Sequence, residues 1–311
     1  MKYRECEVDN LVSTNQNMIR QNRLNLVVRN LLLACAVLTV FITAGIILSL
    51  VMNTFSFFGE VSVWSFLTGT EWTPLFANPQ YGVLPLIAGT LLVTVCAALI
   101  ALPLGLFSAI YLSEYAHPTT RKFLKPVLEI LAGIPSIVYG YFALNLITPT
   151  LQNLIPQTEI YNAASAGIAM GIMIMPMVCS LSEDALSAVP PGMKHGGYAL
   201  GANKLEVVLG ISIPQAFSGI VSSFVLAVSR AIGETMIVTV AAGARPSLTL
   251  NPLVSVQTLT SFIAQASSGD NAHGTTSYYA LYAVGMLLFL ITFSMNILAH
   301  HIIRRRKEAM G

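Results

Sequence analysis

Charged residues are scarce in this sequence. Lys, Arg, Asp and Glu make up 10% of its 311 residues, whereas hydrophobic residues make up 55%. Ordinary soluble domains carry about 25% charged residues. So small a charged fraction excludes an ordinary soluble fold for a chain of this length. The sequence therefore predicts an all-α polytopic protein that crosses a membrane several times.

Cysteine and the common catalytic motifs are sparse as well. The four cysteines show no C-x-x-C or Cys/His spacing, so we expect neither a disulfide nor a metal site. The sequence lacks a G-x-x-x-x-G-K-[ST] loop, so we do not expect this chain to hydrolyse ATP. H-E-x-x-H and G-x-S-x-G are absent too, and we predict no catalytic residue. These absences favour a transport subunit over a membrane enzyme.

Long apolar runs are what the sequence has in abundance. About 20 apolar residues suffice to cross a bilayer. The runs predict a transmembrane domain over 31–303 with six spans, near 31–52, 84–113, 126–148, 163–181, 215–242 and 278–303. The first span is longer than the apolar core of a signal peptide and is expected to stay uncleaved. Pro103 and Pro135 are expected to bend their helices.

The basic residues predict the orientation. Fourteen of the sixteen Lys and Arg residues lie in the segment 1–30, in the loops after the second and fourth spans, or in the tail 304–311. Positively charged segments near spans remain in the cytoplasm. We therefore expect both termini to be cytoplasmic and the tail to contact anionic membrane lipids. Nothing in the sequence predicts a nucleic-acid partner.

A long polar loop, 182–214, joins the fourth and fifth predicted spans. Pro190-Pro191 predicts the start of a new helix within it, because proline suits the first helical turn. Met193–Leu200 could then form two turns, with Gly201 as the stop. We interpret this helix as a docking element on the cytoplasmic side. The alternative is a surface loop with an incidental helical turn.

Two ionisable residues lie inside the fifth predicted span. Arg230 and Glu234 are four residues apart, so they share one face of a continuous helix. A charge at the bilayer centre costs about 2.5–3.5 kcal/mol, so we expect both to face the bundle interior and to pair. A guanidinium suits phosphate oxygens, and Thr235 could add a hydroxyl to an anion path. The alternative is an ion pair that only fixes helix packing.

Three residues of the third predicted span are weaker candidates for the same path. Glu129 lies near the start of the span, where it could join the path, reach water or bond a neighbouring helix. Ser136 and Tyr139 lie beside Pro135 and could line the path. For Tyr139, core packing is the more ordinary role.

Several motifs resemble one transporter family. Gly201, followed after nine residues by Ile211-x-Ile213-Pro214, is similar to the cytoplasmic EAA loop of ABC importer permeases. Further segments resemble the phosphate ABC transporter permeases of the PstC type, namely FLTGTEW (66–72), YGVLPLIAGT (81–90), IPSIVYG (134–140) and RAIGETM (230–236).

The resemblance implies the type I ABC importer permease fold and the import of inorganic phosphate across a bacterial plasma (inner) membrane. In that family, the arginine and glutamate matching Arg230 and Glu234 are implicated in phosphate translocation. The polar loop is implied to couple to an ATPase through Met193, Lys194, His195, Gly196, Gly197, Tyr198, Gly201, Ile211 and Pro214. His195-Gly196-Gly197 departs from the Glu-Ala-Ala of the family, and helical glycine costs about 1 kcal/mol relative to alanine.

The implied partners are an A-type permease, a dimer of ATPase subunits that bind ATP and Mg²⁺, and an extracytoplasmic phosphate-binding protein. The chain itself is expected to need no cofactor. Sulfate or molybdate is the alternative substrate. An ion-driven secondary transporter is the alternative class, although we find no repeat between the two halves. A non-transporting sensor or scaffold would keep the loop without requiring Arg230.

Overall fold

The computed structural model describes residues 2–74, 76, 78–269 and 272–310; side chains are described for 25–74, 76, 78–269, 272–299 and 301. The basic side chains of the tail 304–311 and those before residue 25 lie outside this set. The chain divides into two units, Met1–Met52 and Asn53–Gly311. The first unit is helical from Lys2 onward, as part of α1 (Lys2–Glu60). This helix joins the segment 1–30 and the first predicted span without a break.

The second unit is built from helices, three of which are π-helical turns written η. In chain order these are α2 (Val63–Thr68), α3 (Leu84–Ile110), η1 (Tyr111–Tyr115), α4 (Pro118–Gly133), α5 (Ser136–Phe142), η2 (Ala143–Ile147), α6 (Thr148–Leu154), α7 (Ala163–Ser187), α8 (Pro191–Ala199), α9 (Lys204–Val207), η3 (Val208–Ser212), α10 (Ile213–Ile232), α11 (Met236–Ala241), α12 (Leu259–Ser268) and α13 (Thr276–Met310).

Among the described residues, five helical stretches are long and apolar enough to cross a membrane. They are Asn25–Glu60, Leu84–Tyr115, Ala163–Ser187, Lys204–Ile232 and Thr276–Ala299. α4 together with α5–α6 makes a sixth if the pair is counted as one span, with a bend of 87° between its parts. The expected all-α fold is therefore confirmed. The bend lies at Pro135, as predicted, whereas Pro103 lies inside the unbroken α3.

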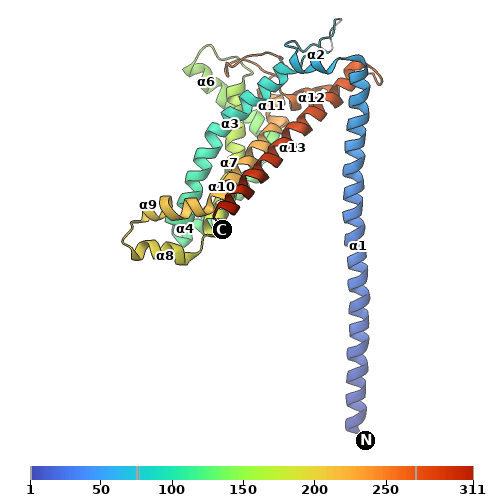
Figure 1. Ribbon diagram of the computed structural model, residues 1–311, viewed down its shortest axis with the longest axis vertical. Coiled ribbons are helices and arrows are strands. Elements are labelled where there is room, and N and C mark those ends of the chain that lie inside the picture. The colour runs from blue at the N-terminus through green and yellow to red at the C-terminus, as the bar shows by residue number, and fades with distance from the viewer. Residues whose placement is uncertain (1, 75, 77, 270–271, 311) are drawn as a thin grey trace. The chain divides into compact units, whose positions relative to one another are not determined.

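α3 and α7 form the centre of the second unit and pack along their lengths, with α10 beside both (Figure 1). Small residues allow the two backbones to approach closely. A Cβ atom at Gly171 of α7 would lie 3.0 Å from the carbonyl oxygen of Ala97 in α3. Such close contact favours helix association in lipid, where dispersion replaces the hydrophobic effect. The resulting core includes Val93, Met170 and Ile174, each about 1% exposed.

The two ends of this bundle carry different elements (Figure 1). α2 and α12 lie at one end, where Trp72 packs edge-on against Phe262 with ring centroids 4.8 Å apart. η1, α8 and α9 lie at the other end, which we call the α8 end. The loop 182–214 thus contributes two helices to a single end of the bundle.

The expectation of one helix over 215–242 is wrong. α10 ends at Ile232, and α11 begins at Met236 after a break at Gly233–Thr235. The Glu234 carboxylate accepts hydrogen bonds from the backbone N–H groups of Met236, at 3.1 Å, and Ile237, at 3.4 Å. It therefore satisfies donors that the first turn of a helix leaves without intrahelical partners.

The helix predicted inside the polar loop is confirmed. α8 spans Pro191–Ala199, with Pro191 in its first turn. Gly201 follows with φ +86°, a conformation that glycine adopts without steric cost and that terminates helices. α7 continues to Ser187, beyond the expected end of the fourth span near residue 181.

Candidate functional site

Arg230 lines a cavity of about 250 Å³ between α4, α7 and α10. α10 runs antiparallel to α7, since Ser223 lies 2.8 Å from Ser182 while Arg230, later in α10, contacts Met177, earlier in α7. This register places Arg230 level with the middle of α7. There its Nη1 lies 4.0 Å from the sulfur of Met177. The guanidinium is thus held at mid-bundle depth by a soft, weakly accepting neighbour, with its donors open to another ligand.

The cavity combines charged groups with apolar walls. Its ionisable lining residues are Lys125, Glu129, Glu183 and Arg230, and the others are Leu112, Leu128, Ala132, Pro176, Met177, Cys179, Ser180 and Leu181. Apolar walls lower the effective dielectric, so charges act on a bound ion more strongly than in water. Arg230 and Lys125 therefore offer an anion two cationic contacts, in a lining whose charge is balanced by Glu129 and Glu183.

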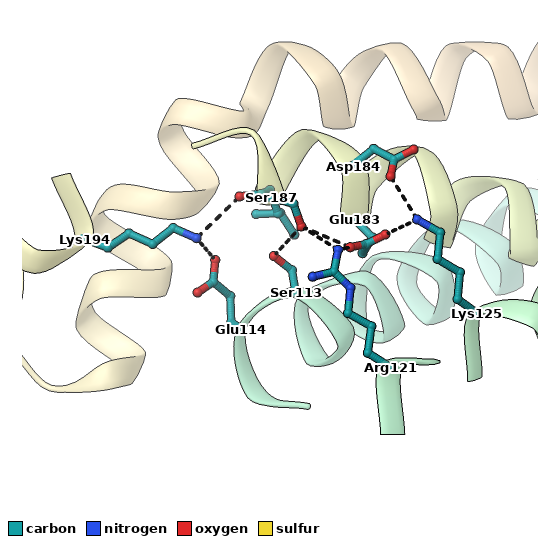
Figure 2. Close-up of polar contacts among 9 residues, drawn as sticks. Ser113, Glu114, Arg121, Lys125, Glu183, Asp184, Ser187 and Lys194 are labelled. Carbon is teal, nitrogen blue, oxygen red and sulfur yellow. Dashed lines mark hydrogen bonds and ion pairs between the residues drawn. The ribbon is translucent and has the colours of Figure 1, made fainter. Parts of the chain in front are cut away.

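Glu183 is the buried centre of an ion cluster beside the cavity (Figure 2). Its side chain is 2% exposed and forms ion pairs with Arg121 and, at 3.0 Å, with Lys125. Ser187 Oγ donates a further hydrogen bond to it at 3.0 Å. Lys125 also reaches the Asp184 carboxylate at 3.2 Å. A buried carboxylate is stable only when paired in this way, and the pairing fixes Lys125 at the cavity wall.

A second, more open hollow of about 700 Å³ adjoins the first. The two share the lining residues Leu112, Lys125 and Glu129, and the second adds Arg121 and Lys122. Since Arg121 and Lys125 bind Glu183 near the end of α7, this hollow lies toward the α8 end. Cationic side chains therefore line the two hollows from Arg230 at mid-bundle, past Lys125, to Arg121 and Lys122 toward the α8 end.

The structure brings together only some of the path residues predicted from the sequence. Arg230 and Glu129 line the same cavity. Glu234 lies in the break after α10, and within the described part of the chain no ion pair joins it to Arg230. The predicted pairing of Arg230 with Glu234 is therefore wrong, because the helix that would have aligned them ends at Ile232.

The remaining path candidates lie outside this cavity's lining. Thr235 Oγ1 donates to the carbonyl oxygen of Gly233 at 3.3 Å, within the break itself. Ser136 is the first residue of α5. The Tyr139 hydroxyl donates to the Leu131 carbonyl at 2.9 Å, and its ring, 6% exposed, belongs to the core. The packing interpretation of this tyrosine fits its contacts.

The residues of the polar loop divide into an outer and an inner set. Met193, His195, Gly196, Tyr198 and Leu200 are exposed. Gly197 is buried, and a Cβ there would lie 2.6 Å from the Cδ1 atom of Ile211, while Pro214 lies in the first turn of α10. Lys194 also points inward, to the Glu114 carboxylate at 2.7 Å. One face of α8 thus packs on the bundle and the other is free to contact a partner.

Most of the ion cluster was not predicted from the sequence. The orientation of the chain was predicted from basic residues that include Arg121 and Lys125, but no ion pair was predicted for these two. Their spacing places them on one face of α4. Glu183 and Asp184 form an acidic pair at the end of an apolar run. Two adjacent acids in that position, opposite a basic loop, were the available indication of an ion cluster.

Comparisons with known proteins agree with this architecture. The family model described as "Binding-protein-dependent transport system inner membrane component" matches residues 101–308. The chain is 33% identical over 302 residues to the "Probable ABC transporter permease protein YqgH" of Bacillus subtilis, covering 95% of this chain and 97% of that protein. It is 34% identical over 296 residues to the "Phosphate transport system permease protein PstC" of Haemophilus influenzae, covering 89% and 92%.

A solved structure supports the fold. It is the crystal structure of a bacterial alginate ABC transporter in complex with an alginate pentasaccharide-bound periplasmic protein. The matched chain gives a TM-score of 0.61 at 15% identity, over 89% of this chain and 95% of that chain. At this identity the likeness concerns the arrangement of helices.

Proposed function

This chain belongs to the family of binding-protein-dependent transport system inner membrane components and is a permease subunit of an ABC importer with the type I fold; from that premise we propose that its substrate is inorganic phosphate. The observation that carries the proposal is the cavity shared by Arg230 and Lys125. The likeness to a phosphate transport system permease supports the choice among oxyanions.

Arg230 is the proposed anion contact. Its planar fork of donors suits two phosphate oxygens at once, and Lys125 adds a point charge on the side toward the α8 end. Glu183 and Glu129 offset the two positive charges of the lining, so that phosphate binds weakly enough to leave, as a transport path requires. Glu234 takes a positioning role, because its carboxylate holds the start of α11 rather than Arg230.

We propose that the α8 end and both termini face the cytoplasm, in a bacterial plasma membrane. The exposed face of α8, with Met193, Tyr198 and Leu200, would dock on an ATPase subunit. ATP and Mg²⁺ would bind to that partner dimer. An A-type permease would complete the membrane part, and a phosphate-binding protein would dock at the end that carries α2 and α12. Closure of the ATPase dimer would push α8 and open the bundle to the outside.

The test is uptake by the complete transporter in cells without other phosphate importers. Initial rates of labelled phosphate, sulfate and molybdate uptake would be measured for the wild type and Arg230→Gln. Hydrogen bonds to a charged group contribute about 1.5–3 kcal/mol, and each 1.4 kcal/mol is tenfold, so phosphate uptake is expected to fall at least about tenfold. Arg29→Gln, which removes an exposed charge that lines neither hollow, is the matched control and should retain uptake.

Each outcome bears on a different part of the proposal. Normal phosphate uptake by Arg230→Gln in an assembled complex would reduce this arginine to a packing role. Uptake of sulfate or molybdate in place of phosphate would change the substrate but not the site. Co-purification of the ATPase with both variants shows that the lost uptake does not arise from failed assembly.

A further inference from the structure

Lys194 joins α8 to the end of α3 through a partly buried ion pair. Its Nζ lies 2.7 Å from Glu114 Oε1, and the two side chains are 18% and 6% exposed. Lys194 also donates to the Leu186 carbonyl of α7 at 3.5 Å. Buried ion pairs add little stability compared with well-packed apolar residues, but they fix the relative geometry of the elements that carry them.

Glu114 lies in η1, the π-helical turn that ends α3. Such turns are rare and occur frequently at functional sites. The residues on either side of Glu114 also contact other helices. Ser113 Oγ lies 3.5 Å from Ser187 Oγ of α7, and the Lys204 ammonium of α9 lies 4.7 Å from the Tyr115 ring centroid. Three consecutive residues of η1 therefore contact three different elements, α7, α8 and α9.

The contacts continue from η1 to the cavity (Figure 2). Ser187, which meets Ser113, donates to Glu183 and accepts from Arg121 at 3.1 Å. Glu183 in turn holds Lys125, and both line the cavity that contains Arg230. Polar contacts, joined through the backbone between Glu114 and Ser113, thus connect α8 to the cavity. Coupling between distant sites needs a contiguous physical connection of this kind, together with evidence that both sites bias it.

We propose that Glu114 and Lys194 form a positioning pair that transmits displacement of α8 to η1 and α3, and from there to the anion cavity. The proposal rests on the proposed function, since α8 is displaced only if an ATPase docks on it. Lys194 suits the task because it is the charged residue on the inner face of α8, opposite the exposed face. A push on α8 therefore moves η1 instead of letting the loop slide across the bundle.

The test uses the complete transporter in proteoliposomes, with its binding protein, and measures phosphate transported per ATP hydrolysed. The variants are Glu114→Gln, Lys194→Met, and the exchange of Glu114→Lys with Lys194→Glu. Each single variant should lower the ratio at least about fivefold, the lower end of usual coupling energies, while ATP hydrolysis continues. The exchange should restore at least about half of the ratio, since it rebuilds the pair. Arg29→Gln is the control, because this exposed arginine lines neither hollow.

A normal ratio in either single variant overturns the proposal. A loss in the single variants without recovery in the exchange also overturns it, because the effect then belongs to the residues separately. If neither single variant assembles, the exchange decides alone: assembly with coupling supports the pair, and failure to assemble refutes it. A wild-type chain that does not bind an ATPase at all would instead refute the proposed function.

Discussion

Replacing Glu183 by Gln should destabilise the protein more than any exposed charge change in the same cavity. The substitution removes the charge that neutralises Arg121 and Lys125 while keeping the side-chain volume. Breaking a buried ion pair on one side costs about 3–5 kcal/mol. Arg121 and Lys125 remain 40% and 36% exposed, so water screens part of this, and about 2–3 kcal/mol is expected.

The measurement is the temperature at which half of the purified protein in detergent loses its monodisperse state. A change of 1 kcal/mol shifts such midpoints by about 2–4 °C, so Glu183→Gln should lower it by roughly 5–10 °C. Glu129→Gln is the matched control, because this exposed carboxylate lines the same cavity and, among the described residues, forms no ion pair. Its midpoint should move by less than about 2 °C. Equal shifts in the two variants, or none in Glu183→Gln, would refute the assignment of Glu183 as the buried centre of the cluster.

Three further predictions concern glycines. Gly196→Ala should stabilise α8 by up to about 1 kcal/mol, because a Cβ at position 196 meets no atom within 4 Å, and it should retain or raise ATPase affinity in a pull-down titration. Gly197→Val should weaken the same binding, since its side chain would displace Ile211; unchanged affinity would contradict the packing of α8 on η3. Gly171→Leu should lower the thermal midpoint by several degrees, because even a Cβ there would lie 3.0 Å from the Ala97 oxygen; an unchanged midpoint would contradict the close approach of α3 and α7.

The helix α8 could be predicted because its determinants are local. Pro191 supplies a first-turn residue, and Gly201 supplies the left-handed conformation that ends the segment. Both effects depend on the backbone of a single residue and act whatever the rest of the fold does. The apolar runs are local signals as well. The six predicted spans match the helices of the structure in number when the bent pair α4 and α5–α6 is counted as one span.

The break at Gly233 and the ion cluster could not be predicted in the same way. Apolar residues flank Gly233-Glu234-Thr235 on both sides, so the hydrophobic pattern favours one helix, and the tertiary contacts of Glu234 reveal the break. There, Thr260, distant in sequence, donates to the Glu234 carbonyl at 2.7 Å. Arg121 and Glu183 likewise lie 62 residues apart, and their meeting depends on how α4 packs on α7. Arg230 was found because a lone arginine in an apolar run is conspicuous by itself.

In α4, large apolar side chains face outward and charged side chains face the bundle, the opposite of an amphipathic helix in a soluble protein. Within this helix, all of which is described, no residue is buried. Phe123 and Ile130 are about 70% exposed on the side away from Arg121 and Lys125, whose charges turn toward α7. In a bilayer an outward apolar face gains nothing by leaving lipid. The ion pairs of Arg121 and Lys125 therefore attach α4 to the bundle together with Leu124 and Leu128, which pack against the core. Because the Debye length is about 8 Å at physiological ionic strength and shrinks as salt rises, salt acts on this attachment before it acts on the packing of α3 against α7.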